Sequence, residues 1–143
     1  MSVIKHKIIE EIALIEIYNP PVNAISAAVR VGLLETIENL SLNEKIKAIV
    51  ITAPERTFLA GADIKEFGKK VDAPILGKIC DKIESLNKIV VASLHGTPLG
   101  GGLEVAMSAH YRIAAPNTKV GLPEVLLGIL PGAGGTQRLP RLC

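Results

Sequence analysis

The sequence of 143 residues predicts an α/β fold in one domain, 1–143, with parallel strand pairing and right-handed crossovers. Two observations predict it. Strand-like apolar segments alternate along the chain with segments of helical periodicity. In addition, two of the strand-like segments are continuous apolar runs, as found in parallel sheets that are buried on both faces. We find no fixed-period repeat and no linker.

The first half of the chain alternates Ile, Val and Leu with charges before the first helical pattern begins. Pro20 and Pro21 end the second strand because proline removes a ladder donor. Ser26 is a suitable N-cap for the helix that follows. The elements predicted here are strands over 2–9, 11–18 and 48–51, and a helix over 27–40.

The second half continues the alternation. Ile75, Ile79 and Ile83 recur at four-residue spacing, which predicts one buried helix face. The elements predicted here are helices over 63–67, 73–86 and 103–109, strands over 89–94 and 111–114, and a final helical turn or two after residue 135.

Composition excludes several classes of function. The hydrophobic fraction of 48% and the charged fraction of 21% are typical of soluble globular proteins. The net charge of +2 and the scattered basic residues give no surface for nucleic acid. No apolar run approaches the ~18 residues that a membrane span requires. Cys80 and Cys143 are far apart in sequence, so we expect two free thiols in a reducing compartment.

Three glycine-rich loops invite a nucleotide-binding interpretation. Residues 100–102 lack the Gly-Lys-Ser/Thr of a P-loop, and residues 132–135 lack the third glycine of a dinucleotide fingerprint, because Gln137 stands there. Residues 60–63 are small enough for a ligand to approach the backbone. Two amides from separate loops of this kind can form an oxyanion hole, although each loop alone also fits a tight turn.

Two acids lie in apolar surroundings. Glu104 follows the glycine triplet in an otherwise apolar helix, and Glu124 lies within Gly-Leu-Pro-Glu-Val-Leu-Leu-Gly. A pair of partly buried carboxyl groups suits acid–base chemistry across a double bond. The alternatives that remain open are a dipole interaction for Glu104, and a capping or ion-pairing role for Glu124.

Four segments together resemble the crotonase (enoyl-CoA hydratase/isomerase) superfamily. Residues 58–67 are similar to its first oxyanion-hole loop, 99–106 to its second, and 120–139 to the segment that carries its second glutamate. Residues 19–24, Asn-Pro-Pro-Val-Asn-Ala, resemble its early CoA-contacting loop. The amino-acid sequence of these segments is most similar to the N-terminal hydratase part of multifunctional β-oxidation enzymes.

The resemblance implies a crotonase-like ββα spiral core whose C-terminal helical part is missing here. It implies that the amides of Ala62 and Gly101 bind the thioester oxygen, that Glu104 activates water and that Glu124 protonates C2. It implies no metal and no cofactor, since CoA is part of the substrate. The residues that it assigns to the CoA thioester are Val22, Ala24, Ala60, Asp63, Ile64 and Gly100.

The implied function is hydration of trans-2-enoyl-CoA in fatty acid β-oxidation, with enoyl-CoA isomerisation as a side activity. The implied partners are the acyl-CoA substrate and either an oligomer or a C-terminal dehydrogenase part. Because the covering helices are missing, we expect the 143-residue chain alone to be inactive. The alternative is a non-catalytic acyl-CoA-binding remnant or interaction module. We expect a bacterial cytoplasmic location, or a peroxisomal one in a eukaryote.

Overall fold

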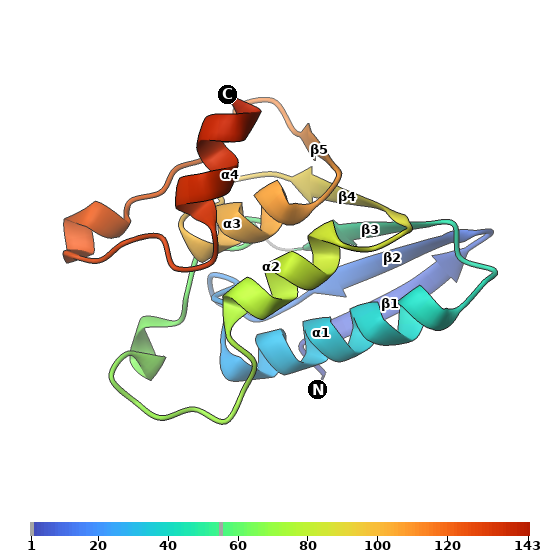
Figure 1. Cartoon of the computed structure of the whole chain (residues 1–143), viewed down its shortest axis with the longest axis horizontal. Coiled ribbons are helices and arrows are strands. Elements are labelled where there is room, and N and C mark those ends of the chain that lie inside the picture. The colour runs from blue at the N-terminus through green and yellow to red at the C-terminus, as the bar shows by residue number, and fades with distance from the viewer. Residues whose placement is uncertain (1, 55) are drawn as a thin grey trace.

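The computed structural model describes residues 2–54 and 56–143, which form a five-stranded sheet with helices packed against it (Figure 1). The sheet order follows the chain, β1-β2-β3-β4-β5. Only β1 and β2 pair in antiparallel fashion, and each later strand pairs in parallel with the one before it. The predicted α/β class with parallel pairing is therefore confirmed. The strands are β1 (Ile4–Ile9), β2 (Ile12–Ile17), β3 (Ala48–Thr52), β4 (Ile89–Leu94) and β5 (Tyr111–Ala114).

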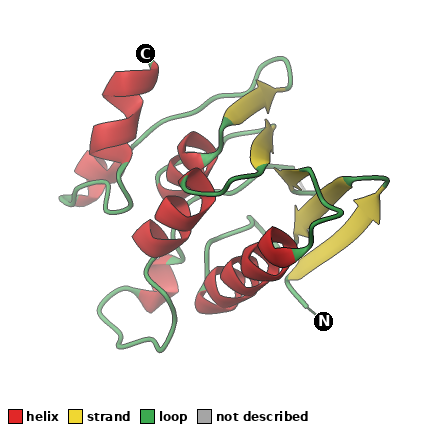
Figure 2. Cartoon of the chain, turned by 45° about the vertical axis from the view of Figure 1, so that its right-hand side comes forward, coloured by secondary structure: helices red, strands yellow, loops and turns green. Residues whose placement is uncertain are grey.

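Helices connect the parallel strands and lie on one side of the sheet, as Figure 2 shows. The first begins where predicted, because the Ser26 side chain accepts a hydrogen bond from Val29 N at 3.4 Å. Asp63 caps a short 3-10 helix in the same way, by accepting from Lys65 N. The helices are α1 (Ala27–Leu42), η1 (Ile64–Glu66), α2 (Leu76–Glu84), α3 (Gly101–Ser108), η2 (Glu124–Leu127) and α4 (Gly135–Leu142).

The core lies between the sheet and the helices. Alternate strand residues are buried because successive side chains point to opposite faces, as Ala13, Ile15 and Ile17 of β2 illustrate. Val29 and Ile37 of α1 belong to the same buried cluster. Aliphatic packing of this kind fixes the sheet edge from which the functional loops emerge.

The helix predicted over 73–86 is shorter in the structure, and one prediction about its buried face is wrong. The helix begins at Leu76, and Ile75 is 76% exposed although its spacing matches the buried Ile79 and Ile83. Pro74 disfavours helical geometry at Ala73, and Ile75 itself has an extended backbone with φ of −67° and ψ of 147°, so the helix starts only at Leu76. Ile75 therefore serves as the N-cap residue and lies at the cavity described below.

Candidate active site

The loop after β3 presents the backbone amide of Ala62 without a hydrogen-bond acceptor among the described residues. Ile25 donates its N–H to Gly61 O at 2.8 Å, and Asp63 donates its N–H to Ile25 O at 3.4 Å. This short parallel bridge uses the groups on either side of Ala62, so the Ala62 N–H points away from Ile25. Among the described residues no hydrogen bond takes up the Ala62 N–H.

The first turn of α3 supplies a second amide of the same kind. Gly100 donates its N–H to Gly121 O at 2.9 Å, and Gly102 donates to Leu99 O at 2.8 Å. Gly101 N lies between them as the first residue of α3, where no helical acceptor is available, and it is likewise unbonded in the described part of the chain.

The two unbonded amides lie side by side. A side-chain carbon at Gly101 would lie 3.7 Å from Ala62 N. The close approach depends on Gly102, where a side-chain carbon would lie only 2.1 Å from Leu59 O. Two adjacent free N–H groups form the arrangement that can bind an oxyanion.

Glu104 lies in the first turn of α3 and is 3% exposed. Its Oε1 accepts hydrogen bonds from Ala133 N and Gly135 N, each at 2.8 Å. Both donors come from the glycine-rich loop before α4. No hydrogen bond to Glu104 Oε2 occurs among the described residues, so this oxygen is available to a ligand or to water.

Glu124 is the first residue of η2 and is 9% exposed. Its Oε2 is buried and has no hydrogen-bond partner among the residues that the structure describes. Its Oε1 lies against Gly100, where a side-chain carbon would come within 2.9 Å of that oxygen. Gly100 also has φ of +48°, so both the backbone conformation and the space require glycine there. A buried carboxyl oxygen without a partner is costly unless a ligand or a proton satisfies it.

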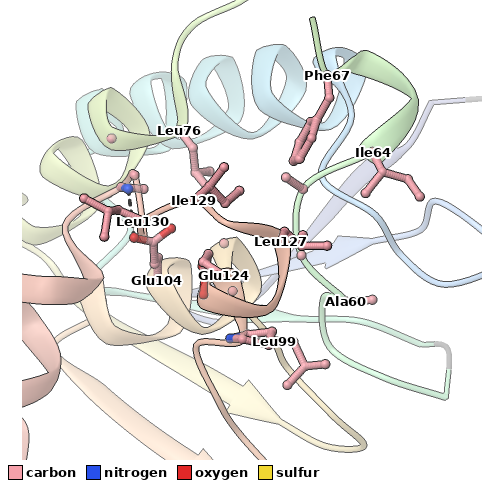
Figure 3. Close-up of a pocket in the computed structure, with 18 of the residues that line it drawn as sticks. Ala60, Ile64, Phe67, Leu76, Leu99, Glu104, Glu124, Leu127, Ile129 and Leu130 are labelled. Atoms are coloured by element: carbon pink, nitrogen blue, oxygen red, sulfur yellow. Dashed lines mark hydrogen bonds between the residues drawn. The ribbon is translucent and has the colours of Figure 1, made fainter.

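Both carboxyl groups and both amides belong to one cavity of about 410 Å³ (Figure 3). The remaining wall is largely apolar, and Figure 3 shows the two carboxyl groups among Leu76, Leu99 and Ile129. The cavity therefore brings two acids and a pair of amide donors together within largely apolar walls. This geometry suits the stabilisation of a developing negative charge together with proton transfer.

Five of the six residues expected to contact the CoA thioester are distributed over three cavities that share lining residues. Ala60, Ile64 and Gly100 line the main cavity. Val22 lines a second cavity of about 390 Å³, which shares Ala60 with the first. Asp63 lines a third, of about 310 Å³, and its side chain is used to cap η1.

Ala24 lines none of these three cavities. Its carbonyl oxygen accepts a hydrogen bond from Asn19 Nδ2 at 2.7 Å, so in this structure it serves the conformation of the loop.

Asn23 has a role that the sequence did not reveal. It is fully buried, and its Nδ2 lies within 3.3 Å of the carbonyl oxygens of Ile17, Thr57 and Phe58. Its own carbonyl oxygen accepts from Ala60 N at 3.3 Å. Asn23 thus joins the 19–24 loop to the loop that presents Ala62. Its left-handed backbone, with φ of +53°, is the kind of position that Asn tolerates.

The part of the chain that the structure describes holds no group of three or more His, Cys, Asp or Glu that could bind a metal ion. Within the same part, no helix has the length and apolar character needed to cross a membrane.

A mostly parallel α/β fold that brings two buried carboxyl groups and two unbonded amides to one cavity has the groups that acid–base chemistry with an oxyanion hole requires. The chain belongs to the enoyl-CoA hydratase/isomerase family, whose model matches residues 7–143. Solved structures of similar fold include DspI of Pseudomonas aeruginosa, with a TM-score of 0.91 and 33% identity, and an enoyl-CoA hydratase from Bacillus anthracis, with a TM-score of 0.90 and 30% identity. The crotonase-like fold that the resemblance implied is confirmed.

Curated relatives differ in total length. The peroxisomal bifunctional enzyme of Danio rerio is 51% identical over 92% of this chain, which spans only 18% of that protein. A probable enoyl-CoA hydratase of Bacillus subtilis (strain 168) is 42% identical over 99% of this chain, which spans 57% of it. The two solved structures cover 99% and 98% of this chain, and the chain covers 57% and 58% of theirs. The chain is thus similar to the hydratase part of the longer proteins and spans just over half of the shorter ones.

Proposed function

We propose that this chain carries the hydratase site of fatty acid β-oxidation, where water adds across the double bond of trans-2-enoyl-CoA to give 3-hydroxyacyl-CoA. The observation that carries the proposal is the meeting of Glu104, Glu124 and the amides of Ala62 and Gly101 at one apolar cavity. The names of the relatives, which include hydratases and peroxisomal β-oxidation proteins, support the same reaction.

In this proposal the two amides bind the thioester oxygen, and the two glutamates transfer the protons. The thioester oxygen accepts hydrogen bonds from Ala62 N and Gly101 N, which stabilise the enolate that forms when C3 is attacked. Glu104 accepts a proton from the attacking water, whose oxygen bonds to C3. Glu124 gives its proton to C2, which restores the thioester carbonyl. The net change is the addition of one water, with one proton gained and one lost by the two acids.

No cofactor enters this proposal, since CoA is part of the substrate. We assign the loop positions Val22, Ala60, Ile64 and Gly100 to the CoA thioester because they line the main cavity and the adjoining one. We assign Ala24 and Asp63 more remote roles in shaping these loops, because their polar groups bond to the protein itself.

We propose isomerisation of enoyl-CoA as a side activity of the same site. Moving a double bond requires removal of one proton and its return at another carbon, which a single acid can perform. Glu124 is suited to that task because its Oε2 has no protein partner.

We propose that the 143-residue chain alone does not turn over substrate. Leu126, Leu127 and Leu130 beside the cavity are 83%, 62% and 80% exposed. An apolar rim of this size needs cover from another segment or another copy before the cavity excludes water. The partners we assign are the acyl-CoA substrate and the covering oligomer or C-terminal part. The location we assign is the bacterial cytoplasm, or the peroxisome in a eukaryote, following the relatives.

The experiment uses the chain itself and a chimera in which residues 1–143 replace the matching segment of the Bacillus subtilis relative. Hydration of crotonyl-CoA is measured for the parent chimera, Glu104→Gln and Glu124→Gln. Each substitution is expected to lower kcat by at least about 100-fold, because each removes one proton transfer. Glu35→Gln on the exposed side of α1 is the matched control and should leave kcat unchanged.

Three results would contradict parts of the proposal. Retention of kcat within about threefold in both glutamine variants would remove these acids from the chemistry. Binding of acyl-CoA without turnover by the chimera would favour a binding module. Rapid hydration by the 143-residue chain would contradict the need for cover.

A further inference from the structure

Arg138 is a charged residue that the proposed chemistry does not use, yet it is only 9% exposed. It lies on α4, and its Nη2 forms ion pairs with Asp81 at 3.0 Å and Glu84 at 2.8 Å on α2. Its Nη1 donates a hydrogen bond to Ala133 O at 2.8 Å. One guanidinium group thus joins an acid pair on α2 to the loop before α4.

That loop is the one that holds Glu104. Ala133 N and Gly135 N both donate to Glu104 Oε1, while the carbonyl between them, Ala133 O, points to Arg138. The peptide whose carbonyl Arg138 binds therefore lies between the two peptides whose N–H groups bind the carboxyl group. Holding the middle peptide limits the directions of the two that flank it, because each peptide is planar and only two soft torsions per residue separate it from its neighbours.

The sequence of the loop is adapted to this contact. Gly134 has φ of +94°, and a side-chain carbon there would lie 2.2 Å from Arg138 Nη1. Only glycine therefore allows the guanidinium group to reach the backbone. On the other side, α2 comes close to the loop at Gly77, where a side-chain carbon would lie 3.9 Å from the Cα of Ala133.

We infer that Arg138 is a positioning residue for the reaction: it holds the 133–135 loop so that two backbone amides fix Glu104 in the cavity. The inference rests on the proposed function of Glu104, to which it adds the group that orients it. Arg138 suits the task because its guanidinium is always charged and presents several donors in a fixed fork. Hydrogen bonding to Glu84, its strongest influence, raises the pKa of this group further above its usual value. Asp81 and Glu84 supply the charge that holds the guanidinium in place.

The first test requires no activity and uses the 143-residue chain. Amide hydrogen exchange is followed by NMR for the parent, Arg138→Met and the control Arg141→Met, which changes an exposed arginine on the same helix. Exchange at Ala133 and Gly135 should become at least about tenfold faster in Arg138→Met alone, with the amides of β2 and β3 unchanged. Unchanged exchange at Ala133 and Gly135 would overturn the inference, as would acceleration that is uniform over the sheet.

The second test is a double-mutant cycle in the chimera. Arg138→Met should lower kcat about ten- to 100-fold with a smaller change in KM, because a displaced Glu104 still leaves the binding surfaces intact. Arg138→Lys, which retains the charge and a donor, should recover part of the loss. In the Glu104→Gln background, Arg138→Met should cost less than about threefold.

The outcomes separate the two proposals. Equal losses from Arg138→Met in both backgrounds would show that it acts independently of Glu104, and would overturn the inference alone. Absence of an effect from Glu104→Gln itself would overturn the proposed function instead.

Discussion

The two acids of the cavity are carried by parts of the molecule that are held very differently. Glu104 belongs to α3, whose eight residues are all buried, and two backbone amides bind its carboxyl group. Glu124 belongs to η2, whose next three residues are 62–83% exposed, and its buried oxygen has no partner.

The difference indicates that the protein holds the carboxyl group of Glu104 more firmly than that of Glu124. Two amides hold the carboxyl group of Glu104 in one orientation, which suits the role of directing water that we propose for it. The carboxyl group of Glu124, by contrast, lies on a turn whose following residues are exposed and give it little packing support. Packing around α3 thus positions Glu104, whereas Glu124 on η2 depends on cover from another segment or another copy for the same support.

The largest effect is expected for a substitution in α3, the helix that carries Glu104. Gly102→Ala places a side-chain carbon 2.1 Å from Leu59 O, so α3 must separate from the loop that carries Ala62. We expect a loss of more than about 3 kcal/mol in the free energy of unfolding, measured by urea denaturation. Gly132→Ala is the matched control at the less constrained side, since nothing lies within 4 Å of its side-chain carbon. Similar stabilities for the two variants would contradict the account of α3 packing.

The next largest effect is expected at Asn23, which joins the 19–24 loop to the loop that presents Ala62. Asn23→Ala removes a buried amide that binds the carbonyls of Ile17 and Thr57, and unfolding should become easier by about 2–4 kcal/mol. Asn117→Ala is the control because Asn117 shares the left-handed backbone, with φ of +67°, but is exposed. The difference between the two variants isolates the hydrogen bonds from backbone strain. Equal losses would show that strain alone accounts for the effect.

Asn23 also shows how far the sequence leads. Its loop could be predicted as a ligand-contacting segment from resemblance, but its buried bonds join residues 34 and 35 positions away in sequence. Local patterns predicted the strands, the Ser26 cap and the buried acids because those follow from periodicity and from neighbouring residues. They could not predict tertiary bonds.

The loop before α4 illustrates the same limit. Its glycines lack the third glycine of a dinucleotide fingerprint, and the sequence indicated only that such a loop can expose backbone amides to a ligand. Their function in the structure is to direct the amides of Ala133 and Gly135 at Glu104, 29 and 31 positions earlier. The exposure of Ile75 likewise follows from the path of the chain around Pro74, which outweighs its helical spacing.

A pH-dependent effect of intermediate size tests how well α2 and α3 exclude water. Burial raises the pKa of the Cys80 thiol to about 12, so the folded state retains a proton that the unfolded chain releases near pH 8.5. Stability should therefore fall above pH 8.5, by up to about 1.4 kcal/mol per pH unit, until the pH approaches the folded-state pKa.

The measurement is the urea midpoint at pH 9 and pH 10 for the parent, Cys80→Ala and Cys143→Ala. Cys80→Ala should show a shallower decline than the parent, whereas Cys143→Ala, at the exposed end of α4, should match the parent. Parallel declines in all three would show that water reaches Cys80 and that the interior beside α3 is less tightly packed than proposed.

The smallest effect is expected for a substitution in η2, the short helix that carries Glu124. Leu126 is 83% exposed, so Leu126→Ala should change the free energy of unfolding by less than about 0.5 kcal/mol. Leu103→Ala, at a 4% exposed position of α3, should cost about 2–5 kcal/mol in the same assay. In the chimera, where we propose that η2 is covered, Leu126→Ala should become clearly destabilising. A loss that stays small in the chimera would mean that the covering segment does not pack on η2, and that Glu124 gains its surroundings in some other way.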